Sequence, residues 1–302
     1  MSISTTEILR ARGSRNLVDE RRPYHFLLEP EFSRNRRLEN VATVFLTNRE
    51  CPFRCLMCDL WQNTTTHTVP EGAISEQIEF ALTRLPTAPH IKLYNSGNFF
   101  DPKAIPRQDW KAIAELVTGF ETVIVENHPR FCDEQCGEFQ QLIGNQVEVA
   151  IGLETSHAPT LAMLNKQMTL RDFESACELL RSQGILLRSF VLLRPPDTSE
   201  QEGIDRAIAS VRFAFDCGVD VCSVIPVRAG NGIMDQLQKS GRFHPPRLSS
   251  LETVLKETLS WQRGRVFADL WDAEKFADDP RDPDATLRQI ATLKRLNETQ
   301  SL

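Results

Sequence analysis

Short runs of apolar residues alternate along the chain with longer segments in which apolar residues recur every three or four positions. Six runs, several of them rich in β-branched residues, predict strands at 41–47, 91–96, 122–127, 147–154, 185–193 and 219–227. The amphipathic segments between them predict helices at 73–85, 106–117, 132–144, 169–184 and 198–218. This alternation predicts βαβ units and therefore an α/β protein with a parallel sheet.

Polar and glycine-containing segments follow the predicted strands, namely NRECPFRC, NSGNFF, ENHPRF, ETSHAP and RPPDTS. In open and in closed α/β sheets, ligands bind at the carboxyl ends of the strands. We therefore expect the functional site at that rim. The periodicity alone fits both an open, doubly wound sheet and a curved, barrel-like one.

The alternation of strands and helices ends after Pro226, and two further helices are predicted at 247–264 and 284–300. We therefore predict three parts. Residues 1–40 form an N-terminal arm, residues 41–235 form the α/β core, and residues 236–302 form a helical C-terminal extension.

Composition narrows the classes of function. The 302 residues are 41% hydrophobic and carry a net charge of −6, which is typical of a globular protein and argues against a free-standing nucleic-acid binder. Nine arginines among the first fifty residues favour a solvated N-terminal arm, with an arm that contacts phosphate groups as the alternative. The sequence shows no membrane-spanning run and no secretory pattern, so we expect a cytoplasmic protein with no membrane partner, in which eight cysteines indicate metal or redox chemistry.

Three cysteines, Cys51, Cys55 and Cys58, lie within eight residues directly after the first predicted strand. Three thiolates can hold three irons of a 4Fe–4S cluster and leave the fourth iron open to a ligand. A structural zinc ion would need a fourth ligand. His67 is the nearest candidate in the sequence, and Cys132 and Cys136 are more distant ones. The spacing favours the cluster, and the zinc site stays open as an alternative.

The segment CPFRCLMC resembles the CxxxCxxC signature of radical S-adenosylmethionine enzymes, and the resemblance extends over roughly residues 40–230. It implies a partial (β/α)6 barrel of the TIM type, so that residues 41–235 would be the radical S-adenosylmethionine core. It also implies one 4Fe–4S cluster whose open iron binds S-adenosylmethionine. Reductive cleavage of that cofactor would give a 5′-deoxyadenosyl radical, with ferredoxin or flavodoxin as an electron donor.

The same resemblance implies a role for the segments that follow the other strands. YNSGNFFD stands where the family usually carries a glycine-rich motif that contacts the cofactor, and Glu126 could accept hydrogen bonds from the ribose or the amine. Arg194 could hold the cofactor carboxylate, and two apolar residues could line the adenine pocket. The expected cofactor-binding residues are Asn95, Ser96, Gly97, Glu126, Glu154, Arg194, Ile225 and Val227, with no catalytic residue assigned.

Two longer stretches, ECPFRCLMCDLWQNTT and KLYNSGNFFDPKAIP, resemble a narrower group. This group contains the radical subunit of archaeosine synthase and its relatives, which have a core like that of the elongator catalytic subunit. The resemblance implies action on a lysine-bearing 7-deazaguanine base in transfer RNA, together with a tRNA-binding partner subunit. The alternatives are a radical enzyme that acts on a small molecule and a non-catalytic zinc-binding interaction module.

Overall fold

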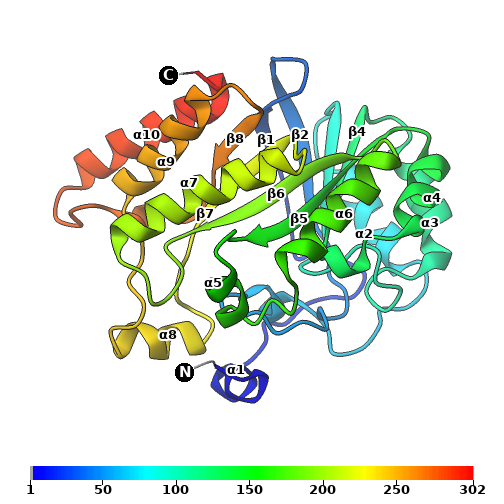
Figure 1. Cartoon of the computed structure of the whole chain (residues 1–302). Helices are drawn as coiled ribbons and strands as arrows, with labels where there is room; N and C mark the ends of the chain where they lie inside the picture. Colours follow the sequence, from blue (N-terminus) through cyan, green and yellow to red (C-terminus); the bar gives the residue numbers. More distant parts are fainter. Residues whose placement is uncertain (1–2, 302) are drawn as a thin grey trace.

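A computed structural model describes residues 3–301, and it shows one curled sheet of eight strands in the order β1 to β8 (Figure 1). β1 runs antiparallel to β2, and every later neighbouring pair is parallel. The strands are β1 (His25–Phe32), β2 (Leu38–Phe45), β3 (His90–Tyr94), β4 (Thr122–Asn127), β5 (Gln146–Glu154), β6 (Leu186–Leu193), β7 (Val221–Pro226) and β8 (Arg265–Ala268). β1 and β8 form the two edges, so the sheet is a partial barrel with a seam between them.

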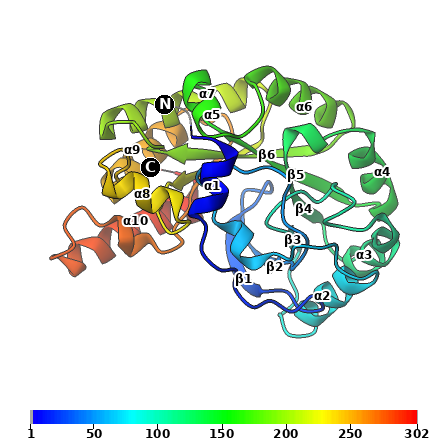
Figure 2. The ribbon, with the colours of Figure 1, turned by 90° about the horizontal axis from the view of Figure 1, so that it is seen from below.

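The longer helices cover the outside of the sheet, and three short helices lie at the carboxyl ends of the strands (Figure 2). The outer helices are α2 (Ala73–Leu82), α3 (Trp110–Val117), α4 (Glu134–Ile143), α6 (Leu170–Ser182), α7 (Glu200–Asp216), α9 (Leu248–Ser260) and α10 (Pro283–Thr299). The short helices are α1 (Thr5–Ala11), α5 (Ala158–Met163) and α8 (Ile233–Lys239). Four 3-10 turns complete the elements: η1 (Leu60–Asn63), η2 (Arg107–Asp109), η3 (Pro129–Phe131) and η4 (Ala273–Phe276).

Side chains alternate between the two faces of the sheet, as the pleat of a strand requires. Val123 and Val125 of β4 are fully buried in the apolar cluster shared with the outer helices. Residues of the opposite parity face the lumen of the barrel, and among them are the charged side chains of Lys92 and Arg188. The main core therefore lies between the sheet and the helices, and the lumen contains buried charged side chains.

The predicted α/β partial barrel of the radical S-adenosylmethionine type is confirmed, and all six predicted strands are present. The sheet nevertheless continues into both flanking parts. Residues 25–32, expected in an arm, form β1, and residues 265–268, expected in a helical extension, form β8. The division of the chain into three parts stays a prediction, although the sheet crosses both of its boundaries.

The charge pattern of β1 explains why the sequence did not predict it as a strand. Its sequence, HFLLEPEF, places Glu29 and Glu31 where a buried strand normally has apolar residues. Both glutamates accept hydrogen bonds from Lys92 Nζ, at 2.9 and 2.6 Å, inside the lumen. A strand whose charges are neutralised by distant partners has no local signal in the sequence.

No helix within the described residues is both long enough and apolar enough to cross a membrane.

Candidate functional site

The three predicted cluster ligands lie in the loop that follows β2, at the carboxyl end of the barrel. Cys51, Cys55 and Cys58 are all partly buried, and none forms a disulfide. The fully buried Leu56 anchors the loop in a second apolar cluster, and its N–H donates to the Leu164 carbonyl at 2.8 Å. One apolar side chain thus holds the loop down while the cysteines stay at the rim.

Side-chain amides from two distant segments fix the backbone of this cysteine loop. Asn165 Nδ2 donates to the carbonyl of Arg54 at 2.7 Å. Asn231 Nδ2 donates to the carbonyls of Leu56 and Cys58, at 2.8 and 3.1 Å. Because these carbonyls flank Cys55 and include that of Cys58, the amides hold the loop that carries the predicted ligands in one conformation.

The N-terminal segment packs against the outside of the same loop. Glu50, which precedes Cys51, pairs with Arg15 and with Arg12, whose Nη1 lies 2.6 Å from Oε1. Arg12 also lies over the Trp61 ring, 4.6 Å from its centroid. The expectation of a solvated arm is therefore wrong for these two arginines, because they pair with a glutamate that belongs to the cysteine loop.

The turn after β3 contains Asn95, Ser96 and Gly97, and it is held by the carboxylate of Glu126. Oε1 of Glu126 accepts the backbone N–H groups of Asn95 and Gly97, at 2.7 and 3.2 Å. Burial raises the pKa of Glu126 to about 7, although these N–H groups act in the opposite direction. Glu126 therefore positions the turn, and direct contact with a cofactor remains a prediction for it.

The side chain of Asn95 fits the expected cofactor. Asn95 is fully buried, and neither its Nδ2 nor its Oδ1 has a hydrogen-bond partner in the described structure. A buried amide without partners costs free energy unless a ligand satisfies it. Beside it, Asn98 Nδ2 donates to Cys51 Sγ at 3.2 Å. The amino and carboxylate groups of an amino-acid cofactor are suitable partners for such an amide.

A buried ion pair closes another side of the site. Glu154, at the end of β5, lies 2.5 Å from Nζ of Lys166, and both side chains are buried. Gly152 leaves the space for this pair, since a Cβ there would collide with both charged groups. Lys166 also favours the thiolate forms of Cys51 and Cys55, which places a positive charge near two predicted cluster ligands.

The remaining predicted cofactor residues lie at the ends of β6 and β7. Arg194 Nη1 contacts Glu200 at 2.5 Å and the Pro245 carbonyl at 2.8 Å, so its charge is already paired within the chain. Binding of the cofactor carboxylate by this arginine stays a prediction. Val227 is buried in the apolar cluster of Leu56, and Ile225 packs against that cluster, which is compatible with an adenine pocket.

Burial raises the pKa of all three thiols, that of Cys55 to about 12. Within residues 3–301, no three His, Cys, Asp or Glu side chains converge on a point suitable for one metal ion. In a 4Fe–4S cluster each thiolate binds a different iron atom, so three cysteine ligands need not converge on one point.

Several contacts that build the site were missed at the sequence level. The ring of His128 stacks on Phe53 of the cysteine loop with centroids 3.8 Å apart, and the backbone N–H of His128 donates to Asn98 Oδ1 at 2.8 Å. Tyr24 Oη lies 2.9 Å from Ser96 Oγ. The position of His128 directly after a strand was the one available signal for it, whereas nothing local identified Tyr24.

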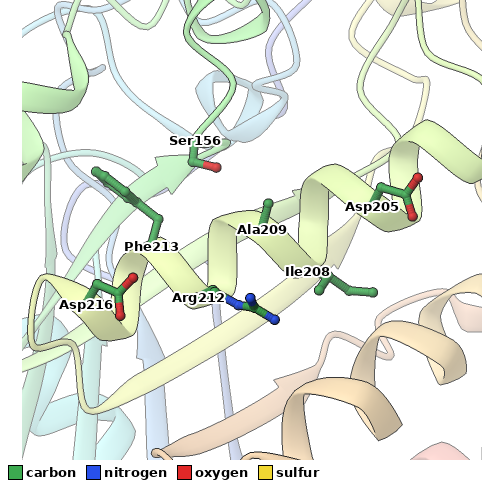
Figure 3. A pocket seen from close by; sticks show the side chains of 7 residues that line it. All are labelled: Ser156, Asp205, Ile208, Ala209, Arg212, Phe213 and Asp216. Atoms are coloured by element: carbon green, nitrogen blue, oxygen red, sulfur yellow. The ribbon is translucent and has the colours of Figure 1, made fainter.

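A shallow depression of about 500 Å³ lies elsewhere, on the outer face of α7 (Figure 3). It is lined by Ser156, Asp205, Ile208, Ala209, Arg212, Phe213 and Asp216. None of these residues belongs to the predicted site, so the depression does not bear on its chemistry.

Two solved structures share this architecture over most of the chain. Methylornithine synthase superposes with a TM-score of 0.57 at 16% identity, over 85% of this chain and 70% of that one. Elp3 of Methanocaldococcus infernus superposes with a TM-score of 0.54 at 17% identity, over 72% of this chain and 58% of the Elp3 chain. Both are radical S-adenosylmethionine enzymes. The chain has the radical S-adenosylmethionine fold.

Curated sequences carry the likeness further. The chain is 25% identical over 215 residues to archaeosine synthase subunit beta of Methanosarcina acetivorans, and 24% identical over 228 residues to that of Thermococcus kodakarensis. The matches cover 67% and 71% of this chain, and 61% and 69% of those proteins. An uncharacterised protein of Methanocaldococcus jannaschii is 23% identical over 80% of this chain and 71% of its own length. No family model matches the chain.

The predicted resemblance to the radical subunit of archaeosine synthase is thereby confirmed as a similarity. On this radical S-adenosylmethionine fold, the cysteine loop follows the first parallel strand, β2, and the turn with Asn95 follows the second, β3. Both segments therefore lie at the carboxyl rim where the fold binds its ligands.

Proposed function

We propose that this protein is a radical S-adenosylmethionine enzyme whose cluster is held by Cys51, Cys55 and Cys58. The observation that carries the proposal is the position of this loop on the radical S-adenosylmethionine fold, next to the fully buried side-chain amide of Asn95, which has no hydrogen-bond partner within residues 3–301. When bound, the cluster would pass one electron to the cofactor, splitting it into methionine and a 5′-deoxyadenosyl radical that takes a hydrogen atom from the substrate.

The residues of the chain have distinct tasks in this proposal. The cysteines bind iron, and Asn95 receives the amino-acid part of S-adenosylmethionine. Glu126 holds the turn that carries Asn95, while Lys166, paired with Glu154, keeps a positive charge beside the thiolates. The apolar cluster that contains Leu56 and Val227 excludes water from the base of the loop.

For the substrate, we propose a modified 7-deazaguanine base in tRNA, presented with a partner subunit in the cytoplasm. The similarity to two archaeosine synthase beta subunits supports this choice. The net charge of −6 is compatible with a partner that contributes most of the phosphate contacts. A ferredoxin or flavodoxin is the proposed source of the electron, and a small-molecule substrate is the second candidate.

The reaction is tested with anaerobically purified protein, by quantifying iron and sulfide and the 5′-deoxyadenosine formed from S-adenosylmethionine under reducing conditions. We expect about four irons per chain and a SAM-derived product that Cys55→Ala abolishes. Cys217→Ala serves as a control, since Cys217 lies at the end of α7, away from the cysteine loop. A colourless protein with one zinc ion per chain would instead identify the interaction module.

The substrate is tested separately, by mass spectrometry of tRNA nucleosides from cells with and without the gene. We expect the lysine-bearing 7-deazaguanine nucleoside to accumulate when the gene is deleted. An unchanged nucleoside profile, together with normal formation of 5′-deoxyadenosine in vitro, would leave the radical enzyme in place and move the substrate to the small-molecule class.

A further inference from the structure

Two aromatic rings meet across the seam between the edge strands, at the carboxyl end of the barrel. Trp271 follows β8 and is 55% exposed. Its ring lies 5.9 Å from that of His25, the exposed first residue of β1, at an angle of 74°. Because β1 is antiparallel to β2 and His25 pairs with Phe45, this end of β1 lies at the rim that carries the cysteine loop.

A row of rings leads from this seam toward the predicted cofactor turn. Phe45 lies 5.8 Å from His25 and 5.6 Å from Tyr24, measured between ring centroids. Tyr24 in turn contacts Ser96 of the turn after β3, with 2.9 Å between the two hydroxyl oxygens. A flat molecule bound at the seam would therefore lie at one end of an aromatic path that reaches the proposed cofactor site.

Asp269 links the backbone of Trp271 to the side chain of Arg228. Asp269 Oδ1 accepts the backbone N–H of Trp271 at 2.9 Å, and Arg228 Nη2 donates to Asp269 Oδ2, also at 2.9 Å. Within residues 3–301 this is the one hydrogen bond that Arg228 donates, and its guanidinium also lies over the Phe276 ring, 5.7 Å from the centroid. The other N–H groups of Arg228 can therefore donate to an acceptor on a ligand, while Asp269 holds the arginine next to the backbone of Trp271.

The seam is closed differently at its two ends. At the amino end, Arg265 Nη1 donates to the Phe32 carbonyl at 3.2 Å, and α10 packs against both β1 and β8. At the carboxyl end, the contact between His25 and Trp271 joins the two edges. An accessible ring with a neighbouring guanidinium is suited to bind a flat heterocycle by stacking and hydrogen bonding.

We propose that Trp271, His25 and Arg228 form a subsite for the heteroaromatic base of the substrate. The base stacks on the exposed indole, His25 borders it, and the guanidinium of Arg228 donates to acceptor atoms on its edge. This inference rests on the proposed function, because it takes the substrate to contain a base, and it adds the residues that recognise that base.

Binding measurements on the anaerobically reconstituted full chain test the subsite. Guanosine and unfractionated tRNA serve as probes, in the presence of S-adenosylmethionine, and the dissociation constants are obtained by titration calorimetry. We expect Trp271→Ala to weaken binding at least fivefold, whereas Trp271→Phe keeps most of it. Leu287→Ala, an equally exposed apolar residue on α10, should leave binding unchanged.

The outcomes separate the subsite from the proposed function. If the wild-type protein binds both guanosine and tRNA, the subsite recognises the base on its own. If it binds only tRNA, the subsite recognises a base that is presented within RNA. Equal affinities of wild type and Trp271→Ala, or a wild type that binds neither probe, would overturn the subsite while iron content and cofactor cleavage stand. If Trp271→Ala fails to fold, the same titration is made with Arg228→Lys. This variant keeps the positive charge but loses the planar guanidinium, so it should also weaken binding of the probes.

Discussion

At the amino end of the barrel the charged side chains in the lumen form one ion-pair network, whereas the carboxyl end combines a buried ion pair, Glu154 with Lys166, with a buried amide and a buried carboxylate that form no ion pair among the described residues. Glu31 accepts from Lys92 at 2.6 Å and pairs with Arg188 at 2.5 Å. Arg188 Nε also donates to Glu148 at 2.6 Å. Burial alone would raise the pKa of Glu31, but these two cations hold it well below its usual range.

Two groups at the carboxyl end differ from this network. The buried amide of Asn95 has no hydrogen-bond partner among the described residues, and burial raises the pKa of Glu126 to about 7. A folded chain tolerates such groups where a ligand completes them. The ion-pair network at the amino end is therefore expected to contribute mainly to stability, and Asn95 and Glu126 belong to the ligand site proposed at the carboxyl end.

The largest expected effect is at the amino end. Arg188→Met should lower the free energy of unfolding by about 3–5 kcal/mol, because it leaves two buried glutamates without their shared cation. Urea denaturation measures this loss. The matched control is Arg263→Met, whose exposed pair with Asp216 should contribute less than about 1 kcal/mol. Equal losses in both variants would break the comparison.

A smaller effect is expected from Glu126→Gln, and its sign depends on pH. Since burial raises the folded pKa of Glu126 above 4.5, to about 7, the folded state holds a proton that the unfolded state loses first. The wild type therefore loses stability relative to Glu126→Gln between about pH 5 and pH 7, by about 1–3 kcal/mol. Denaturation midpoints across this range measure it, and a constant difference would refute the unpaired buried carboxylate.

Asn95→Ala should separate binding from stability. Removing an amide without partners should leave the unfolding free energy of the cofactor-free protein within about 1 kcal/mol of wild type. The same change should weaken binding of S-adenosylmethionine about tenfold, or about 1.4 kcal/mol. Calorimetry of the reconstituted protein measures the affinity. Asn16→Ala, which removes a surface contact with Asn63, is the control with unchanged affinity.

The smallest effect is expected where the N-terminal segment meets the cysteine loop. Arg15→Met removes one of three arginines that pair with Glu50 and should cost about 1 kcal/mol or less, since Arg12 and Arg54 remain. A thermal-shift assay measures this change. A loss as large as that of Arg188→Met would show that the segment belongs to the stable core of the barrel.

The sequence was sufficient where the signal is local. The buried parallel strands are short apolar runs, and the cysteine loop follows one of them, so both the fold class and the predicted ligands could be read from neighbouring residues. The turn at Asn95 was predicted in the same way, from its position after a strand.

The sequence was insufficient where a residue depends on a partner far along the chain. Glu31 becomes a strand residue because Arg188 neutralises it from a position 157 residues away. His25 and Trp271 meet across the seam only because the sheet curls. Such contacts follow from the topology of the sheet, and no pattern among neighbouring residues in the sequence predicts them.

The proposed function requires that Cys51, Cys55 and Cys58 hold a cluster with an open iron beside the buried side-chain amide of Asn95. Electron paramagnetic resonance of the anaerobically reduced protein tests it most directly, with and without S-adenosylmethionine. We expect a 4Fe–4S signal that changes when S-adenosylmethionine is added and that disappears in Cys55→Ala. A protein without a cluster signal, or a signal that S-adenosylmethionine leaves unchanged, would contradict it.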